Sequence, residues 1–204
     1  GWQREDRPIS IWLLRQHSLT PAPLPRAGEG FQNHTRRSSI RTPIPIVNST
    51  TLIIPGLYGS GSDHWQTWLE ARVSGAQRVE QDDWNVAALN QWTRRVGDAI
   101  DRAVGQVWLV AHSFGCLAAV TAAVNRADRV AGALLVAPAN PERFVAAGLQ
   151  PTASAFAAQS NEARDTITQF VPHQSLGFPS ILVASSNDPW MRLTAASVWA
   201  DRWG

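Results

Sequence analysis

The fold class of this chain is decided by one stretch, Gln106-Val107-Trp108-Leu109-Val110-Ala111-His112-Ser113-Phe114-Gly115. Its first six residues form an almost unbroken apolar run of strand length, which is typical of a buried parallel strand. An Ala-rich segment continues to Asn125 and is predicted to be helical. At the junction stands one serine, with a small residue two positions to either side. The stretch therefore predicts a strand, a sharp turn and a helix.

The same alternation of strand and helix extends in both directions. Three further apolar runs are predicted strands, 51–54, 130–136 and 180–184, and another strand is predicted over 77–80. Further helices are predicted from about Asp63 (with Gln66 at capping-box spacing), after Asn85, and over 191–203. This order predicts an α/β protein with a doubly wound, mostly parallel sheet.

The first 48 residues differ in composition from the rest. They contain six of the thirteen prolines and show no sustained period of either helix or strand. We expect residues 1–48 to be a disordered or non-native N-terminal extension. Residues 49–204 are predicted to form one α/β domain.

Charge and composition exclude several classes of partner. Residues 1–48 carry seven Arg and three acidic residues, whereas residues 49–204 carry eleven Arg and thirteen acidic residues. The predicted domain is therefore mildly acidic, and we expect no nucleic-acid partner. No apolar run is long enough to predict a membrane span, and no His or carboxylate cluster has metal-ligand spacing. We expect no metal, no cofactor and no membrane partner, and the lone Cys116 suits a reducing cytoplasm.

Ser113 is the predicted nucleophile. The run from Ala111 to Gly115 resembles the nucleophile-elbow motif G-x-S-x-G, with alanine in place of the first glycine. Such a turn is strained and leaves space only for small neighbours. The backbone N–H of Phe114, at the start of the following helix, is a predicted oxyanion donor. A chance strand–helix junction with small residues is the alternative.

Asp188 is the predicted acid that orients the base. It follows the strand 180–184, at the carboxyl end of the sheet, and it follows Ser113 in the chain order Ser, Asp, His of this motif class. The alternative is a turn or capping aspartate before Pro189.

The glycine-rich loop 56–62 follows the first predicted strand. We expect the N–H of Leu57 in this loop to be the second oxyanion donor. A dinucleotide site is the alternative, although the glycine spacing G-x-x-G-x-G departs from that fingerprint.

Several aromatic residues have predicted positions. His64, Trp65 and Trp190 lie at loop edges and are possible pocket-lining residues, with capping or packing as the alternative for His64. Trp68, Trp92 and Trp108 are predicted core residues.

Taken together, four segments resemble the small serine hydrolases of the retinoblastoma-binding-protein-9 family, also called YdeN-like: Pro55 to Gln66, His112 to Gly115, Val136 to Pro138, and Ser185 to Trp190. The resemblance covers about residues 50–204. It implies a compact α/β-hydrolase fold, a small-molecule substrate with an ester-like bond, and a Ser-Asp-His triad of carboxylesterase type. Ser113 and Asp188 correspond to the first two members.

The family's histidine has no counterpart in this sequence. It belongs to a Gly-His-Ile-Asn-like motif after one further strand, whereas this sequence ends at Gly204. We therefore expect a domain truncated at its C-terminal strand and an impaired enzyme. His112 is expected to point away from Ser113, because adjacent side chains at such a turn diverge, and His173 precedes Asp188. A non-catalytic binding protein on the same scaffold is the alternative function, and the oligomeric state is left open.

Overall fold

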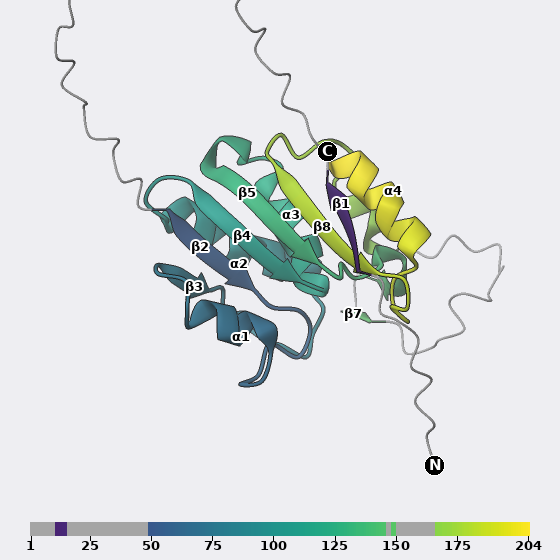
Figure 1. Cartoon of the computed structure of the whole chain (residues 1–204), viewed down its shortest axis with the longest axis horizontal. Helices are drawn as coiled ribbons and strands as arrows, with labels where there is room; N and C mark the ends of the chain where they lie inside the picture. The colour runs from purple at the N-terminus through teal and green to yellow at the C-terminus, as the bar shows by residue number, and fades with distance from the viewer. Residues whose placement is uncertain (1–10, 16–48, 146–147, 150–165) are drawn as a thin grey trace, which may run out of the picture.

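The computed structural model describes residues 11–15, 49–145, 148–149 and 166–204. Its centre is a six-stranded sheet with the order β1-β8-β5-β4-β2-β3 (Figure 1). The strands are β1 (Ile11–Arg15), β2 (Thr50–Ile54), β3 (Ala76–Arg78), β4 (Val107–His112), β5 (Val130–Val136) and β8 (Ser180–Ser185). The pairings β2–β3, β2–β4, β4–β5 and β5–β8 are all parallel. The predicted mostly parallel α/β sheet is confirmed.

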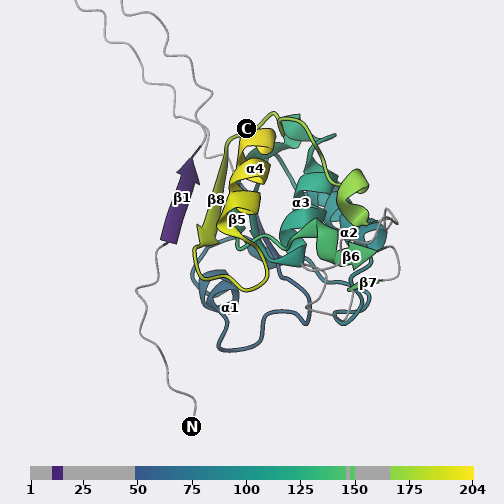
Figure 2. The same ribbon diagram turned by 90° about the vertical axis from the view of Figure 1, so that its right-hand side faces the viewer.

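Four helices pack around this sheet: α1 (Trp65–Glu70), α2 (Leu89–Arg102), α3 (Phe114–Ala123) and α4 (Leu193–Trp203). Figure 2 shows α2, α3 and α4 together on one side of the sheet. Their buried side chains form a single apolar cluster with those of the central strands. The cluster includes the predicted stripe on α2, namely Leu89, Trp92, Val96 and Ile100.

None of the helices in the described part of the chain has the length and apolar character needed to cross a membrane.

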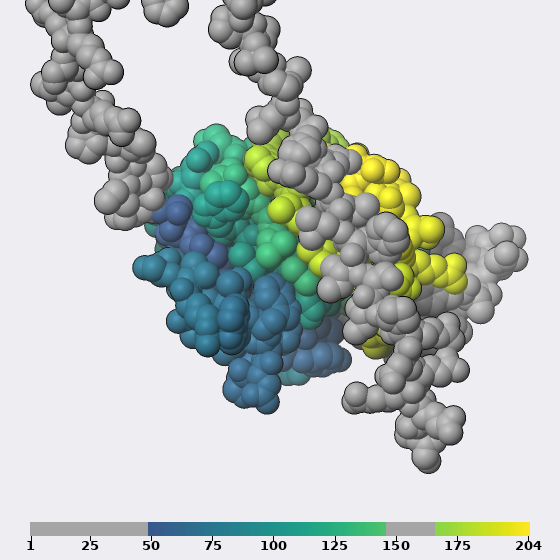
Figure 3. Space-filling model, in the orientation of Figure 1, coloured from purple at the N-terminus to yellow at the C-terminus, as the bar shows by residue number. Residues whose placement is uncertain are grey.

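The sheet register explains why Trp108 is not in the core. Trp108 lies opposite Gly132 on β5, and a Cβ on that glycine would stand 2.5 Å from the indole ring. By register Ile181 shares this face, which is opposite to the face that packs against α2 and α3. Trp108 is 48% exposed and Trp68 58% exposed, so the prediction that both are core residues is wrong. Figure 3 shows atoms of β4 and β5 at the surface on this side.

The expectation that all of residues 1–48 are irregular is wrong for one short segment. Ile11–Arg15 forms β1, an antiparallel strand that pairs Ile11 with Ser185 and Arg15 with Ile181. The outer edge of β8 offers unpaired N–H and C=O groups, which an apolar segment of matching length can satisfy. The rest of 1–48 lies outside the described residues.

Gly115 is fixed by the close approach of β2 to α3. A Cβ at this position would stand 2.2 Å from the carbonyl oxygen of Pro55, whereas a Cβ on Gly61 would meet nothing within 4 Å. We expect Gly115→Ala to lower the free energy of unfolding by about 1–3 kcal/mol, because the backbone has no room to yield and the clash outweighs the gain in helix propensity. The matched control, Gly61→Ala, is expected to be neutral or slightly stabilising. Urea unfolding monitored by circular dichroism measures both, and equal midpoints for the two variants would contradict the packing described.

Candidate active site

Ser113 occupies a strained turn between β4 and α3. Its φ of 52° and ψ of −124° lie in a region that residues other than glycine seldom adopt. Hydrogen bonds hold the turn in place. The Ser113 N–H donates to the Val136 carbonyl (3.0 Å), and the Ser113 carbonyl accepts from the N–H groups of Cys116 (3.0 Å) and Ala139 (3.1 Å). The structure thus places Ser113 at the predicted sharp turn, anchored to the end of β5.

The glycine loop after β2 packs directly against this turn. A Cβ on Gly56 would stand 2.7 Å from the Cβ of Ser113, so only glycine fits. The N–H of Tyr58 donates to the Trp84 carbonyl, and that of Gly59 donates to the Gly56 carbonyl. The N–H of Leu57 has no acceptor among the described residues. The loop therefore packs against the serine and leaves the amide of Leu57 available there.

A cavity of about 350 Å³ opens beside Ser113. Its lining residues are Leu57, Tyr58, His112, Ser113, Ala137, Pro138, Ala139, Asn140, Arg143, Phe144, Asp188 and Trp190. Four residues singled out in the sequence thus share one cavity: Ser113, Asp188, Leu57 and Trp190. The ring of Phe114 is fully buried against Trp92 and Phe144, with ring centroids 5.1 and 4.8 Å apart. Phe114 is not among the residues that line the cavity, so its predicted role rests on its backbone N–H alone.

His64 and Trp65 do not line this cavity but pack against His112, which does. Their rings lie 4.8 and 6.2 Å from that of His112. His64 is also the N-cap of α1, because its Nδ1 accepts the N–H of Gln66 at 3.2 Å. The predicted capping box from Asp63 is wrong. The side chain of Gln66 is instead buried and donates to the carbonyls of β2 and β4.

Asp188 is both a turn residue and a cavity residue. Its Oδ1 accepts the N–H groups of Trp190 (2.7 Å) and Met191 (3.2 Å). The carboxylate that closes this turn also lines the cavity of Ser113. The capping alternative and the cavity position are therefore compatible.

His112 directly precedes Ser113 and also lines the cavity. That its side chain points away from Ser113 stays a prediction. Burial and, to a smaller extent, the charge of the neighbouring His64 lower the pKa of His112 to about 4, against the opposing effect of the Asp188 charge. The ring is therefore neutral at pH 7.

Arg143 was not singled out in the sequence. It ends a short 3₁₀ helix, Pro141–Arg143, in the irregular connection after β5. Asn140 begins this helix by accepting the N–H of Glu142, and that start is visible in the sequence as Asn-Pro. No pattern in the sequence indicated that the arginine would turn inward.

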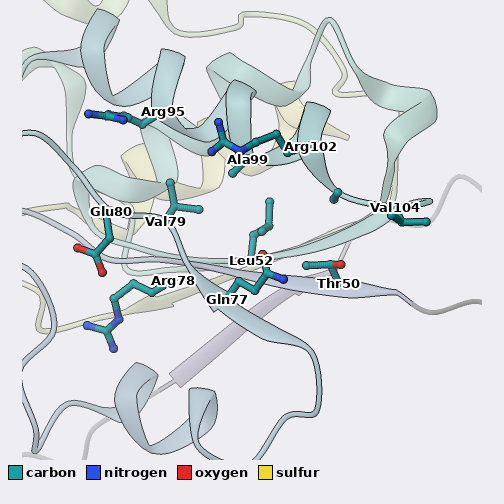
Figure 4. A pocket seen from close by; sticks show the side chains of 11 residues that line it. Thr50, Leu52, Gln77, Arg78, Val79, Glu80, Arg95, Ala99, Arg102 and Val104 are labelled. Atoms are coloured by element: carbon teal, nitrogen blue, oxygen red, sulfur yellow. The ribbon is translucent and has the colours of Figure 1, made fainter.

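A second cavity of about 420 Å³ lies between β2, β3 and α2 (Figure 4). Its similar size does not distinguish it from the cavity at Ser113, but its lining contains no serine, cysteine or histidine. Two of its arginines already pair with carboxylates, Arg78 with Glu70 and Arg95 with Asp82. The cavity at Ser113 is therefore the candidate active site.

A family model described as serine hydrolase matches residues 51–204. The chain belongs to this serine hydrolase family. A YdeN-like hydrolase of Pectobacterium atrosepticum is 33% identical, with a TM-score of 0.61, over 76% of this chain and 72% of its own. The ydeN gene product of B. subtilis shares the fold, with 20% identity and a TM-score of 0.50 over 76% of this chain and 81% of its own. Among curated proteins no match was found. The resemblance inferred from the motifs is confirmed.

The pKa of His112 predicts how the stability of this serine hydrolase depends on pH. The pKa of His112 falls from 6.5 to about 4 on folding. At pH values between these two, the unfolded chain therefore binds a proton at His112 more readily than the folded chain does. The free energy of unfolding should therefore decrease as the pH is lowered through this window, by on the order of 3 kcal/mol from this group. Urea unfolding at several pH values measures the slope. His112→Gln should flatten it, and an unchanged slope in that variant would contradict the burial described.

Proposed function

We propose that this serine hydrolase cleaves ester-like carbonyl bonds by acyl transfer to water, with Ser113 as the nucleophile. The supporting observation is the strained turn between β4 and α3, which places Ser113 in the lining of a cavity. In the first step Ser113 Oγ bonds to the carbonyl carbon, and the alcohol leaves with a proton. In the second step water attacks the acyl-serine, which releases the acid and restores the hydroxyl.

The negative charge that develops on the carbonyl oxygen needs donors held in place. The N–H of Phe114 lies in the first turn of α3, where N–H groups have no intrahelical acceptor. The N–H of Leu57 belongs to the loop that packs on Ser113, and Leu57 lines the same cavity. We assign these two groups to the oxyanion hole. Each such donor contributes roughly a hundredfold or more to the rate in related sites.

Asp188 is proposed to orient the imidazole that accepts the serine proton. Its Oδ1 is held by two backbone N–H groups, which fixes the carboxylate at the cavity. In the chain order of this motif class the histidine follows the acid, and residues 189–204 contain no histidine. His112 lies in the cavity but directly precedes the serine. A polypeptide of residues 1–204 alone is therefore expected to have only residual activity, of the kind that an oxyanion hole supports without a base.

Hydrolysis of p-nitrophenyl acetate tests the proposal. We expect slow release of p-nitrophenol, accelerated by added imidazole acting as an external base. Ser113→Ala should reduce both rates to those of the protein-free solution, because the acyl acceptor is gone. Ser62→Ala, an exposed serine in the neighbouring loop, is the matched control and should behave as wild type.

Two outcomes would contradict the proposal. Activity that survives in Ser113→Ala would place the nucleophile elsewhere. A folded wild-type protein that is inert with and without imidazole would favour a non-catalytic binding protein on the same scaffold.

A further inference from the structure

Two exposed aromatic residues line the cavity at Ser113. Tyr58 is 70% exposed and Trp190 57% exposed, and both belong to the lining. Tyr58 follows β2 and Trp190 follows β8. The sheet order β8-β5-β4-β2 places the end of β4, where Ser113 stands, between these two strands (Figure 1). The two aromatic residues therefore belong to loops on opposite sides of the nucleophile.

Trp190 is held at its backbone and at its ring. Its N–H donates to Asp188 Oδ1 at 2.7 Å, and the guanidinium carbon of Arg143 lies over the indole, 4.1 Å from the ring centre. More than half of the residue is exposed in spite of this stack, so the opposite face of the ring is accessible. An aromatic side chain that is already fixed loses little conformational entropy when a ligand stacks on it.

The charge of Arg143 restricts what can occupy the accessible face of Trp190. A cationic group there would be repelled by the guanidinium on the other side of the ring, whereas a neutral aromatic ring would not. Much of the remaining lining is apolar, from residues such as Leu57, Pro138 and Phe144. The cavity therefore suits an uncharged aromatic group.

Tyr58 has a backbone conformation that its packing does not explain. Its φ of 69° lies in the left-handed region, which residues other than glycine and asparagine seldom adopt. The N–H of Tyr58 donates to the Trp84 carbonyl at 2.7 Å, which fixes this backbone. Because the residue is largely exposed, burial of its ring does not offset the strain. Strain of this kind beside a nucleophile points to a binding role for the ring.

We infer that Tyr58 and Trp190 bind an aromatic ring on the acyl chain of the substrate, so that the preferred esters are those of aryl-substituted carboxylic acids. The acyl group is the relevant part because it is bonded to Ser113 between the two steps, within reach of the cavity lining. The inference rests on the proposed function of Ser113 and extends it to a substrate class. Tyr58 and Trp190 are specificity-determining residues here, and the covalent steps remain those of Ser113.

The test compares p-nitrophenyl phenylacetate with p-nitrophenyl cyclohexylacetate, which share a leaving group and differ only in the acyl ring. Each kcat/KM is divided by the rate constant of the same ester with imidazole in protein-free solution, which removes differences in intrinsic reactivity. The cyclohexyl ring offers at least as much apolar surface, so burial alone would not favour the phenyl ester. Contact between aromatic rings should favour the phenyl ester by roughly three- to tenfold in wild type.

Variants at Trp190 separate recognition from general damage to the site. Trp190→Leu keeps the backbone N–H that donates to Asp188 but removes the ring, so the ratio of the two esters should fall to about one. Trp190→Phe restores an aromatic face and should recover part of the preference. A merely structural role would lower both rates and leave their ratio unchanged.

Trp68 provides the matched control. It is 58% exposed and has Arg72 stacked over its ring at 4.3 Å, but it does not line the cavity. Trp68→Leu should therefore leave the ratio of the two esters as in wild type.

Tyr58→Asn tests the second aromatic residue. Asparagine adopts a positive φ more readily, so the free energy of unfolding in urea should be unchanged or higher, while the ratio of the two esters falls. A less stable variant with an unchanged ratio would overturn the role assigned to Tyr58.

Binding separates failure of this inference from failure of the proposed function. Calorimetry on Ser113→Ala, in which the ester stays intact, should show tighter binding of methyl phenylacetate than of methyl cyclohexylacetate. Adding Trp190→Leu should abolish this difference. If wild type hydrolyses no ester but Ser113→Ala keeps the difference, the proposed function fails and the aromatic site stands. Equal binding of the two methyl esters would overturn the inference, as would a wild-type ratio of one or below, or an unchanged ratio in Trp190→Leu.

Discussion

The backbone at Ser113, with φ of 52° and ψ of −124°, is the constraint on which the surrounding structure depends. A residue with a side chain remains in this region only when its neighbours fix it there, at a cost of about 1–3 kcal/mol. Here hydrogen bonds to β5 and to the loop after it hold the turn. Gly56 and Gly115 let β2 and its loop approach the turn more closely than any larger residue would allow. The strain thus exposes one hydroxyl beside backbone N–H groups at the start of α3.

Packing around this turn also determines the electrostatics of the cavity. Burial keeps His112 neutral at pH 7, and the charge of Asp188 acts on both His112 and Arg143. Each of these charges is less screened in the cavity than it would be at the surface. The nucleophile and the charged groups near it therefore arise from the same arrangement of β4, β5 and the loop after β8.

Much of this was predictable from local sequence. The apolar run before Ser113 and the small residues around it specify strand, turn and helix without reference to the rest of the chain, and Asp188 follows from its place after a strand. Burial of Trp108 was mispredicted because one face of the sheet is left open at Gly132, which depends on the strand register. Arg143 could not be found from sequence, because its inward orientation results from packing on a distant tryptophan in an irregular segment.

The central claim is that Ser113 and the N–H groups of Leu57 and Phe114 form one site for a tetrahedral oxyanion. A crystal structure with phenylboronic acid, which becomes tetrahedral when a serine oxygen binds to boron, tests this directly. The account predicts a bond from boron to Ser113 Oγ, with one boronate oxygen about 3 Å from both N–H groups. Boronate bound at another residue, or bound at Ser113 with its oxygens directed away from both N–H groups, would contradict the account.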